Sequence, residues 1–117
     1  MAQKEIFDSD ELYRRFPKLY LRPDGTLSPG AFNNTTDTDE MSVELAKLTI
    51  PQKTALDNPT FGVASFQAGL ARSLNQEVFH DPQPCNNAHS TVRGQKTHSI
   101  KNQLAKAAKI LINHHSE

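Results

Sequence analysis

The sequence feature that most constrains the fold of this chain is an apolar stripe near its C-terminus. Between Thr97 and residue 113, apolar side chains recur at the 3.6-residue spacing of one helix face, at Ile100, Leu104, Ala107, Ala108 and Leu111. Thr97 or Ser99 can cap the first turn of this helix. A helix with so wide an apolar face has to pack on a sheet or against other helices.

The length and composition predict one small domain. A chain of 117 residues has room for a single core of modest size. Hydrophobic residues make up 36% of it, less than in most globular domains, so we expect long polar connections around that core. We expect residues 1–8 and 113–117 to fray and residues 26–40 to form a long loop.

Apolar alternation, capping residues and prolines divide the rest of the chain into short elements. They predict helices over residues 9–16, 51–57 and 67–74. They predict two short strands around the turn at 23–25, and further strands over 41–45, 61–65, 77–80 and 88–92. This order indicates an α+β fold, with a small, mostly antiparallel sheet packed by the C-terminal amphipathic helix and by shorter helices. Residues 61–80 also suggest one right-handed β-α-β unit.

The charge of the chain is balanced, with 13 acidic and 13 basic residues. A balanced chain has no overall field that would draw it to DNA or to an anionic membrane. Residues 60–117 are nevertheless mildly basic and contain all five histidines. This local excess indicates a phosphate group or an acidic partner, and it is equally typical of a helix face in water.

The cysteine content and the N-terminal segment predict a cellular location. A single cysteine excludes an intramolecular disulfide. The first residues lack the apolar segment of a signal peptide, and no apolar run approaches the roughly 18 residues of a membrane helix. We therefore expect a cytoplasmic protein with no membrane partner.

Side chains able to bind a metal cluster in the last third of the chain, at His80, Asp81, Cys85, His89 and His98. Zinc sites use four such ligands, usually in closely spaced Cys or His pairs, and this segment has no such pair. We therefore expect neither a metal site nor a cofactor.

Cys85, with His89 four residues later, also suggests a cysteine nucleophile, although a loop between two strands explains the same residues.

The start of the last helix offers an anion site. The free N–H groups of a first helical turn attract anions, and charge and hydroxyl groups would be added by Arg93, Lys96, Thr97 and His98. A phosphate, a nucleotide or an RNA backbone would suit this site. Capping by Thr97 and ordinary solvated lysines explain the same pattern.

The stretch LYRRFPKLYLRPDG interleaves aromatic residues with arginines and lysine. Such a mixture is typical of surfaces that bind single-stranded nucleic acid. A helix that buries Tyr13 and Phe16 and exposes Arg14 and Arg15 has the same composition, and we favour that interpretation.

Several motifs occur in order along nearly the whole chain: LYRRFPK, RPDGTLSPGAF, FGVASF, HDPQPCNNAHS and RGQK before the last helix. In this order they resemble a group of short, uncharacterised bacterial proteins. The resemblance implies a complete bacterial protein and transfers no activity. It makes Asn87, His89 and the turn at 94–96 the first choices for a site.

No motif of known catalytic or metal-binding specificity is present, so we expect a non-catalytic binding module that serves a protein partner or a larger assembly. The alternative is a small enzyme or toxin-like factor acting on RNA or a nucleotide phosphate. In that enzyme His89 would act as acid and base, with charge stabilised by Arg14, Arg93 and Lys96. RNA binding without catalysis is a third hypothesis. The enzyme hypothesis requires His89, Arg93 and an N-terminal arginine to share one concave surface.

Overall fold

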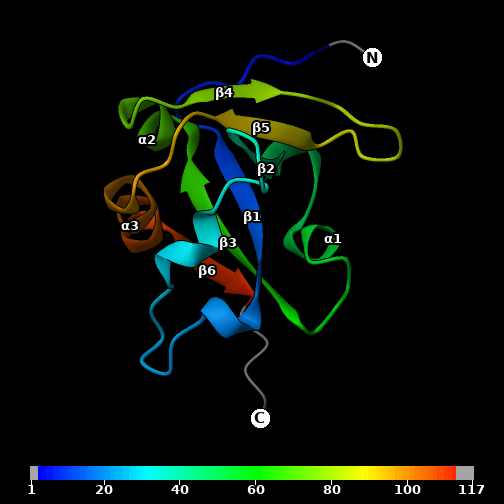
Figure 1. Ribbon diagram of the computed structural model, residues 1–117. Coiled ribbons are helices and arrows are strands. Elements are labelled where there is room, and N and C mark those ends of the chain that lie inside the picture. The colour runs from blue at the N-terminus through cyan, green and yellow to red at the C-terminus, as the bar shows by residue number, and fades with distance from the viewer. Residues whose placement is uncertain (1–2, 113–117) are drawn as a thin grey trace.

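Six strands form one antiparallel sheet at the centre of the molecule (Figure 1). The computed structural model describes residues 3–112. The strand order is β4-β5-β2-β1-β3-β6, and every pairing among the described residues is antiparallel. The strands are β1 (Glu11–Pro17), β2 (Glu40–Leu45), β3 (Phe61–Gln67), β4 (Glu77–His80), β5 (His89–Arg93) and β6 (Lys109–Ile112). The α+β class and the antiparallel sheet expected from the sequence are confirmed.

Short helices lie on both sides of this sheet. Figure 1 shows α2 and α3 on one side of the central strands and α1 on the other. The α-helices are α1 (Pro51–Thr54), α2 (Ala68–Ser73) and α3 (His98–Ala107), and the 3-10 helices are η1 (Lys18–Tyr20), η2 (Pro29–Phe32) and η3 (Ala46–Leu48). Within residues 3–112, no helix has the length and apolar character needed to cross a bilayer.

The main core lies between the sheet and the side occupied by α2, α3 and η2. Alternate strand residues such as Leu12 and Val43 are buried there. Phe32 of η2 meets Phe66 of β3 edge to face, with 5.8 Å between ring centroids. Leu104 of α3 is completely buried in the same cluster. The C-terminal helix therefore contributes to the core through Leu104 and Ala105, whereas Ala107 of the predicted stripe is exposed.

The helix predicted over residues 9–16 is wrong, because this segment forms β1. The strand pairs along its whole length with β3. Leu12 and Phe16 are buried in the core, and the Phe16 ring lies so close to Gly62 that no Cβ would fit there. A helix of about two turns is marginal by itself, since nucleation is costly. The long ladder to β3 and the burial of two large side chains outweigh the local capping signals.

The C-terminal helix is shorter than the sequence predicts. It ends at Ala107, because Ala108 adopts an extended conformation and the next residues form β6. Ile110 and Ile112 are β-branched and suit a strand, and β3 offers them an edge to pair with. Leu111 is consequently 44% exposed instead of packed on the core.

Two other local predictions also fail. The β-α-β unit at 61–80 is not formed, because β3 lies beside β1 and β6 while β4 lies beside β5. Around the turn at 23–25, the structure has η1 and a single bridge between Leu21 and Leu27 in place of two strands.

Segments expected to be loose are held by specific contacts. Ile6 is buried in the core, and the backbone N–H of Lys4 donates to His80 Nδ1 at 2.8 Å. The loop at 26–40 contains η2, whose Phe32 is completely buried. The fraying predicted for residues 1–2 and 113–117 lies outside the described residues.

Leu104 tests how α3 packs on the core. Leu104→Ala removes a completely buried side chain, so we expect the free energy of unfolding to fall by about 2–5 kcal/mol. Gln103→Ala, on the exposed face of the same helix, is the control and should change it by less than about 0.5 kcal/mol. Urea unfolding followed by circular dichroism measures both. Equal stability of Leu104→Ala and the wild type would contradict the packing.

Candidate functional site

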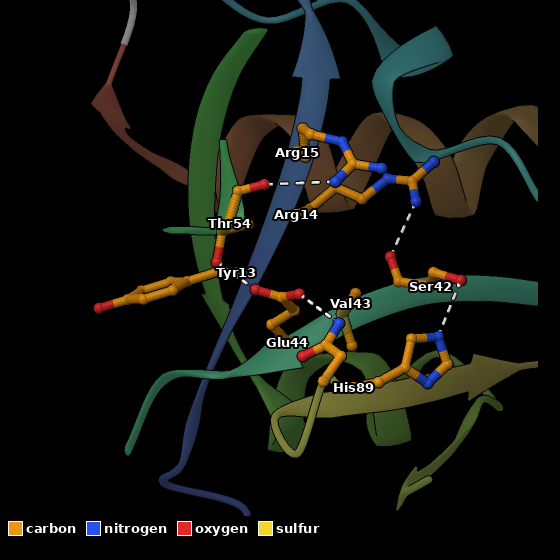
Figure 2. Close-up of a pocket in the computed structure, with 9 residues that line it drawn as sticks. Tyr13, Arg14, Arg15, Ser42, Val43, Glu44, Thr54 and His89 are labelled. Atoms are coloured by element: carbon orange, nitrogen blue, oxygen red, sulfur yellow. Dashed lines mark hydrogen bonds between the residues drawn. The ribbon is translucent and has the colours of Figure 1, made fainter. Parts of the chain in front are cut away.

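A cleft of about 160 Å³ lies where β1 and β2 separate (Figure 2). The two strands pair only at Leu12–Leu45 and Tyr13–Glu44. Beyond these pairs the strands no longer share a ladder, and side chains occupy the space between them. The cleft is lined by residues 13–15 of β1, residues 42–44 of β2, Thr54 of α1, Asn86 of the β4–β5 loop and His89 of β5.

Arg14 fills the gap between the two strands. Its guanidinium donates from Nη1 to the carbonyl of Ser42 at 2.8 Å, from Nε to Ala31 O at 2.9 Å and from Nη2 to Asn33 O at 3.1 Å. Burial, together with the neighbouring charge of Arg15, lowers the pKa of Arg14 to about 10. Arg14 is still a cation at neutral pH. In the part of the chain that the structure describes, its hydrogen-bond partners are all neutral carbonyls.

Arg15 reaches the same cleft from the outer face of the sheet. Its Nη1 donates to the carbonyl of Thr54 at 3.3 Å, and its guanidinium lies over the Phe61 ring, 5.1 Å from the centroid. Within residues 3–112 it has no ion pair with a carboxylate. The cleft therefore receives two guanidinium groups from consecutive residues of one strand.

Glu44 is the acidic residue in the lining of the cleft. Its two carboxylate oxygens accept from the hydroxyl of Thr54 at 2.6 Å and from the side-chain amide of Asn86 at 2.7 Å. Both donors are neutral, and both hold the carboxylate on the side of the cleft formed by α1 and the β4–β5 loop (Figure 2).

His89 stands at the start of β5 with both ring nitrogens engaged. Nδ1 lies 2.8 Å from the carbonyl of Asp81, and since a carbonyl only accepts, Nδ1 must carry a proton. In the neutral ring Nε2 then has a free lone pair, and it lies 3.2 Å from the Ser42 hydroxyl. The carboxylate Oδ2 of Asp81 is 3.8 Å from Nδ1 and accepts from the hydroxyl of Thr91 at 3.1 Å.

The predicted catalytic set is brought together only in part. His89 and Arg14 line the cleft, as the enzyme hypothesis requires. Arg93 extends from the far end of β5 and makes ion pairs with Glu40 at 3.3 Å and Glu77 at 3.5 Å. It is therefore engaged outside the cleft, so the requirement that it share one concave surface with His89 and an N-terminal arginine is not met.

The anion site predicted at the start of α3 is not assembled. Lys96 donates inward to Asn34 Oδ1 at 2.5 Å and to the carbonyls of Val92 and Gly94. The Thr97 hydroxyl accepts from the N–H of Ile100 and caps the helix. His98 is exposed on the first turn of α3, and Arg93 is bound to carboxylates. These four residues serve different neighbours, so the capping interpretation describes this segment better.

The residues considered as metal ligands do not gather at one point, although Asp81 and His89 are in contact. His80 is buried, with Nδ1 accepting from Lys4 and Nε2 within 2.6 Å of the carbonyl of Asn87, while Cys85 is exposed in the β4–β5 loop. Among residues 3–112, no three Cys, His, Asp or Glu side chains are placed to hold a metal ion.

The N-terminal aromatic residues do not form an exposed stacking surface. Phe16 is buried in the core, and Tyr20 packs over Gly30 of η2. Tyr13 alone of the three lines the cleft.

Sequence reasoning misses Ser42 and Glu44 as site residues, and it considers Arg15 only as one of the arginines of the N-terminal stretch. The strand predicted at 41–45 alternates apolar and polar side chains, so it does place Ser42 and Glu44 on one face. What the sequence lacks is the pairing of β2 with β5, which puts Ser42 beside His89.

Comparison with known proteins adds no assignment. No protein-family model matches the chain, and neither a curated protein nor a solved structure matches it. The function is therefore inferred from the geometry of the site.

Lys96 makes stability depend on pH. Burial lowers the pKa of Lys96 to about 8 from an ordinary value of 10.5, and the charge of Arg14 acts in the same direction. Between these two values the unfolded chain binds more protons than the folded chain, so this group makes stability rise with pH. We expect the unfolding free energy of the wild type to increase relative to Lys96→Met between about pH 7.5 and pH 9.5.

Urea unfolding of both proteins at the two pH values measures this difference. Between about pH 5.5 and pH 6.5 Lys96 is protonated in both states, so the difference between the proteins should stay constant. A difference that is also constant from pH 7.5 to 9.5 would contradict the lowered pKa.

Proposed function

We propose that this protein is a binding module whose cleft receives an anionic group presented by a protein partner. The observation that carries the proposal is that Arg14 and Arg15 line one cleft, while the hydrogen bonds of their side chains within the described chain go to carbonyls. An anion between them would relieve the repulsion that contributes to the lowered pKa of Arg14. A carboxylate or phosphate group fits this requirement.

The size of the cleft supports a group carried by a larger partner. Its volume of about 160 Å³ is below the range of roughly 300–1,000 Å³ that is typical of pockets for whole small molecules. A single carboxylate or phosphate group would fit, and the rest of the partner would lie on the surrounding surface.

An apolar hollow adjoins the cleft. It is an open depression lined by Pro17, Lys18, Leu19, Pro59, Thr60 and Phe61. Leu19 is 79% exposed there. Arg15 connects the two features, because it lines the cleft and lies over the Phe61 ring. An anionic side chain with an apolar neighbour would contact both surfaces at once.

A second candidate function is a small enzyme acting on RNA or a nucleotide phosphate. The contact of His89 with the Ser42 hydroxyl favours it, because a ring nitrogen in the cleft is available for proton transfer. Its charge-stabilising residues would be Arg14 and Arg15, since Arg93 and Lys96 are engaged elsewhere. In either case we place the protein in the bacterial cytoplasm, in agreement with its single cysteine.

Arg15 tests the proposal because it is exposed and its loss should leave the fold intact. We expect inorganic phosphate and acetate to bind the wild-type cleft, and Arg15→Gln to weaken that binding by about tenfold or more, since one charged hydrogen bond is lost. Amide chemical shifts around residues 42–44 and 86–89 during titration measure the affinity.

Arg93→Gln is the matched control, because it removes another exposed arginine that lies outside the cleft. It should bind both anions as the wild type does. The proposal would be contradicted if Arg93→Gln weakened anion binding as much as Arg15→Gln does. It would also be contradicted if the amide chemical-shift changes were confined to residues far from the cleft. Tighter binding of adenosine monophosphate than of phosphate would favour the enzyme candidate.

A further inference from the structure

We infer that Ser42 is a nucleophile activated by His89, and that the cleft hydrolyses carboxylic esters bearing an anionic group. The preference for an anionic substrate rests on the proposed function, because it uses the two arginines. The nucleophile itself rests on separate contacts, which involve Ser42, His89 and Asp81.

The hydrogen bonds fix the direction of proton transfer. The carbonyl of Asp81 binds His89 Nδ1 at 2.8 Å, so the neutral ring keeps its proton on that nitrogen. The other nitrogen, Nε2, can only accept, and the Ser42 hydroxyl at 3.2 Å is its partner. The Ser42 hydroxyl therefore points its proton at a base, which is the arrangement that activates a serine.

A third group completes the arrangement. The Asp81 carboxylate lies 3.8 Å from His89 Nδ1 and is held by the hydroxyl of Thr91 at 3.1 Å. A negative charge at that distance would stabilise the imidazolium that forms when Nε2 takes a proton. Asp81 is thus a positioning residue: its carbonyl orients the ring and its carboxylate supports the charge.

The nucleophile is accessible and lies beside positive charge. Ser42 is exposed and lines the cleft. The guanidinium of Arg14 is hydrogen-bonded at 2.8 Å to the carbonyl of this same residue. A cation held at the backbone of the nucleophilic residue would help to stabilise the negative oxygen that develops when Ser42 attacks.

The reaction balances with water as the second substrate. Ser42 Oγ forms a bond to the ester carbonyl carbon, its proton moves to His89 Nε2, and the carbon–oxygen bond to the alcohol breaks as the alcohol takes that proton. Water then attacks the acyl carbon and gives a proton to Nε2. The bond to Ser42 breaks, and Oγ recovers the proton. One ester and one water give one acid and one alcohol.

A neutral fluorophosphonate probe tests the nucleophile without knowledge of the natural substrate. It forms a bond between Ser42 Oγ and phosphorus with loss of fluoride, and the hydroxyl proton passes to His89. Intact mass spectrometry should show one adduct per chain, and peptide mapping of the wild type should place it on Ser42. Ser42→Ala should not be labelled. His89→Gln should be labelled at a rate lower than that of the wild type by about 100-fold or more.

Ser99→Ala is the control, because Ser99 is an exposed serine on α3 outside the cleft; it should label at the wild-type rate. An unlabelled wild type, an adduct on another residue, or equal labelling of Ser42→Ala would overturn the inference. If the wild type binds phosphate but is not labelled by the probe, the assignment of Ser42 as a nucleophile is contradicted and the proposed function is not. If the probe labels Ser42 but the wild type binds neither phosphate nor acetate, the proposed function and the preference for an anionic substrate are contradicted.

Discussion

The structure depends on the buried guanidinium of Arg14. It joins three segments that the chain order keeps apart, because it extends from β1 to the carbonyls of Ser42, Ala31 and Asn33. Where β1 and β2 stop pairing, a side-chain hydrogen bond replaces the missing ladder contact. One side chain thus holds the strands at the separation that forms the cleft.

The loop around η2 is held in the same way by other cations. Lys96 donates to the side chain of Asn34, and Lys101 donates to the side chain of Asn33 at 2.8 Å. The amide of Asn34 in turn donates to the carbonyl of Gly94. The positive charges therefore meet neutral oxygens in this network. Among the described residues no carboxylate is hydrogen-bonded to Arg14, so its charge would favour an anion in the proposed binding cleft, against the single negative charge of Glu44 in the lining.

The sequence predicts what local patterning controls and fails where distant segments compete. Alternation correctly predicts the strands at 41–45 and 77–80, and Thr97 correctly marks the start of α3. Residues 9–16 carry helix signals, but a ladder of seven residue pairs with β3 decides their conformation. The site shows the same limit: His89 is recognisable as a candidate, whereas its neighbour Ser42 follows from the pairing of β2 with β5. Arg14 is recognisable in the sequence as a basic residue. Its burial could not be predicted, because it depends on the gap that opens where β1 and β2 stop pairing.

The two described histidines next to the β4–β5 loop differ in what their ring nitrogens contact. His80 is buried, and its ring bridges the N–H of Lys4 and the carbonyl of Asn87, so both nitrogens serve the backbone. His89 binds the backbone through one nitrogen only and presents the other to a hydroxyl in an open cleft. A histidine with both nitrogens bound to backbone groups fixes a fold. One that is oriented by a carbonyl on one side, with a lone pair free on the other, is oriented for proton transfer.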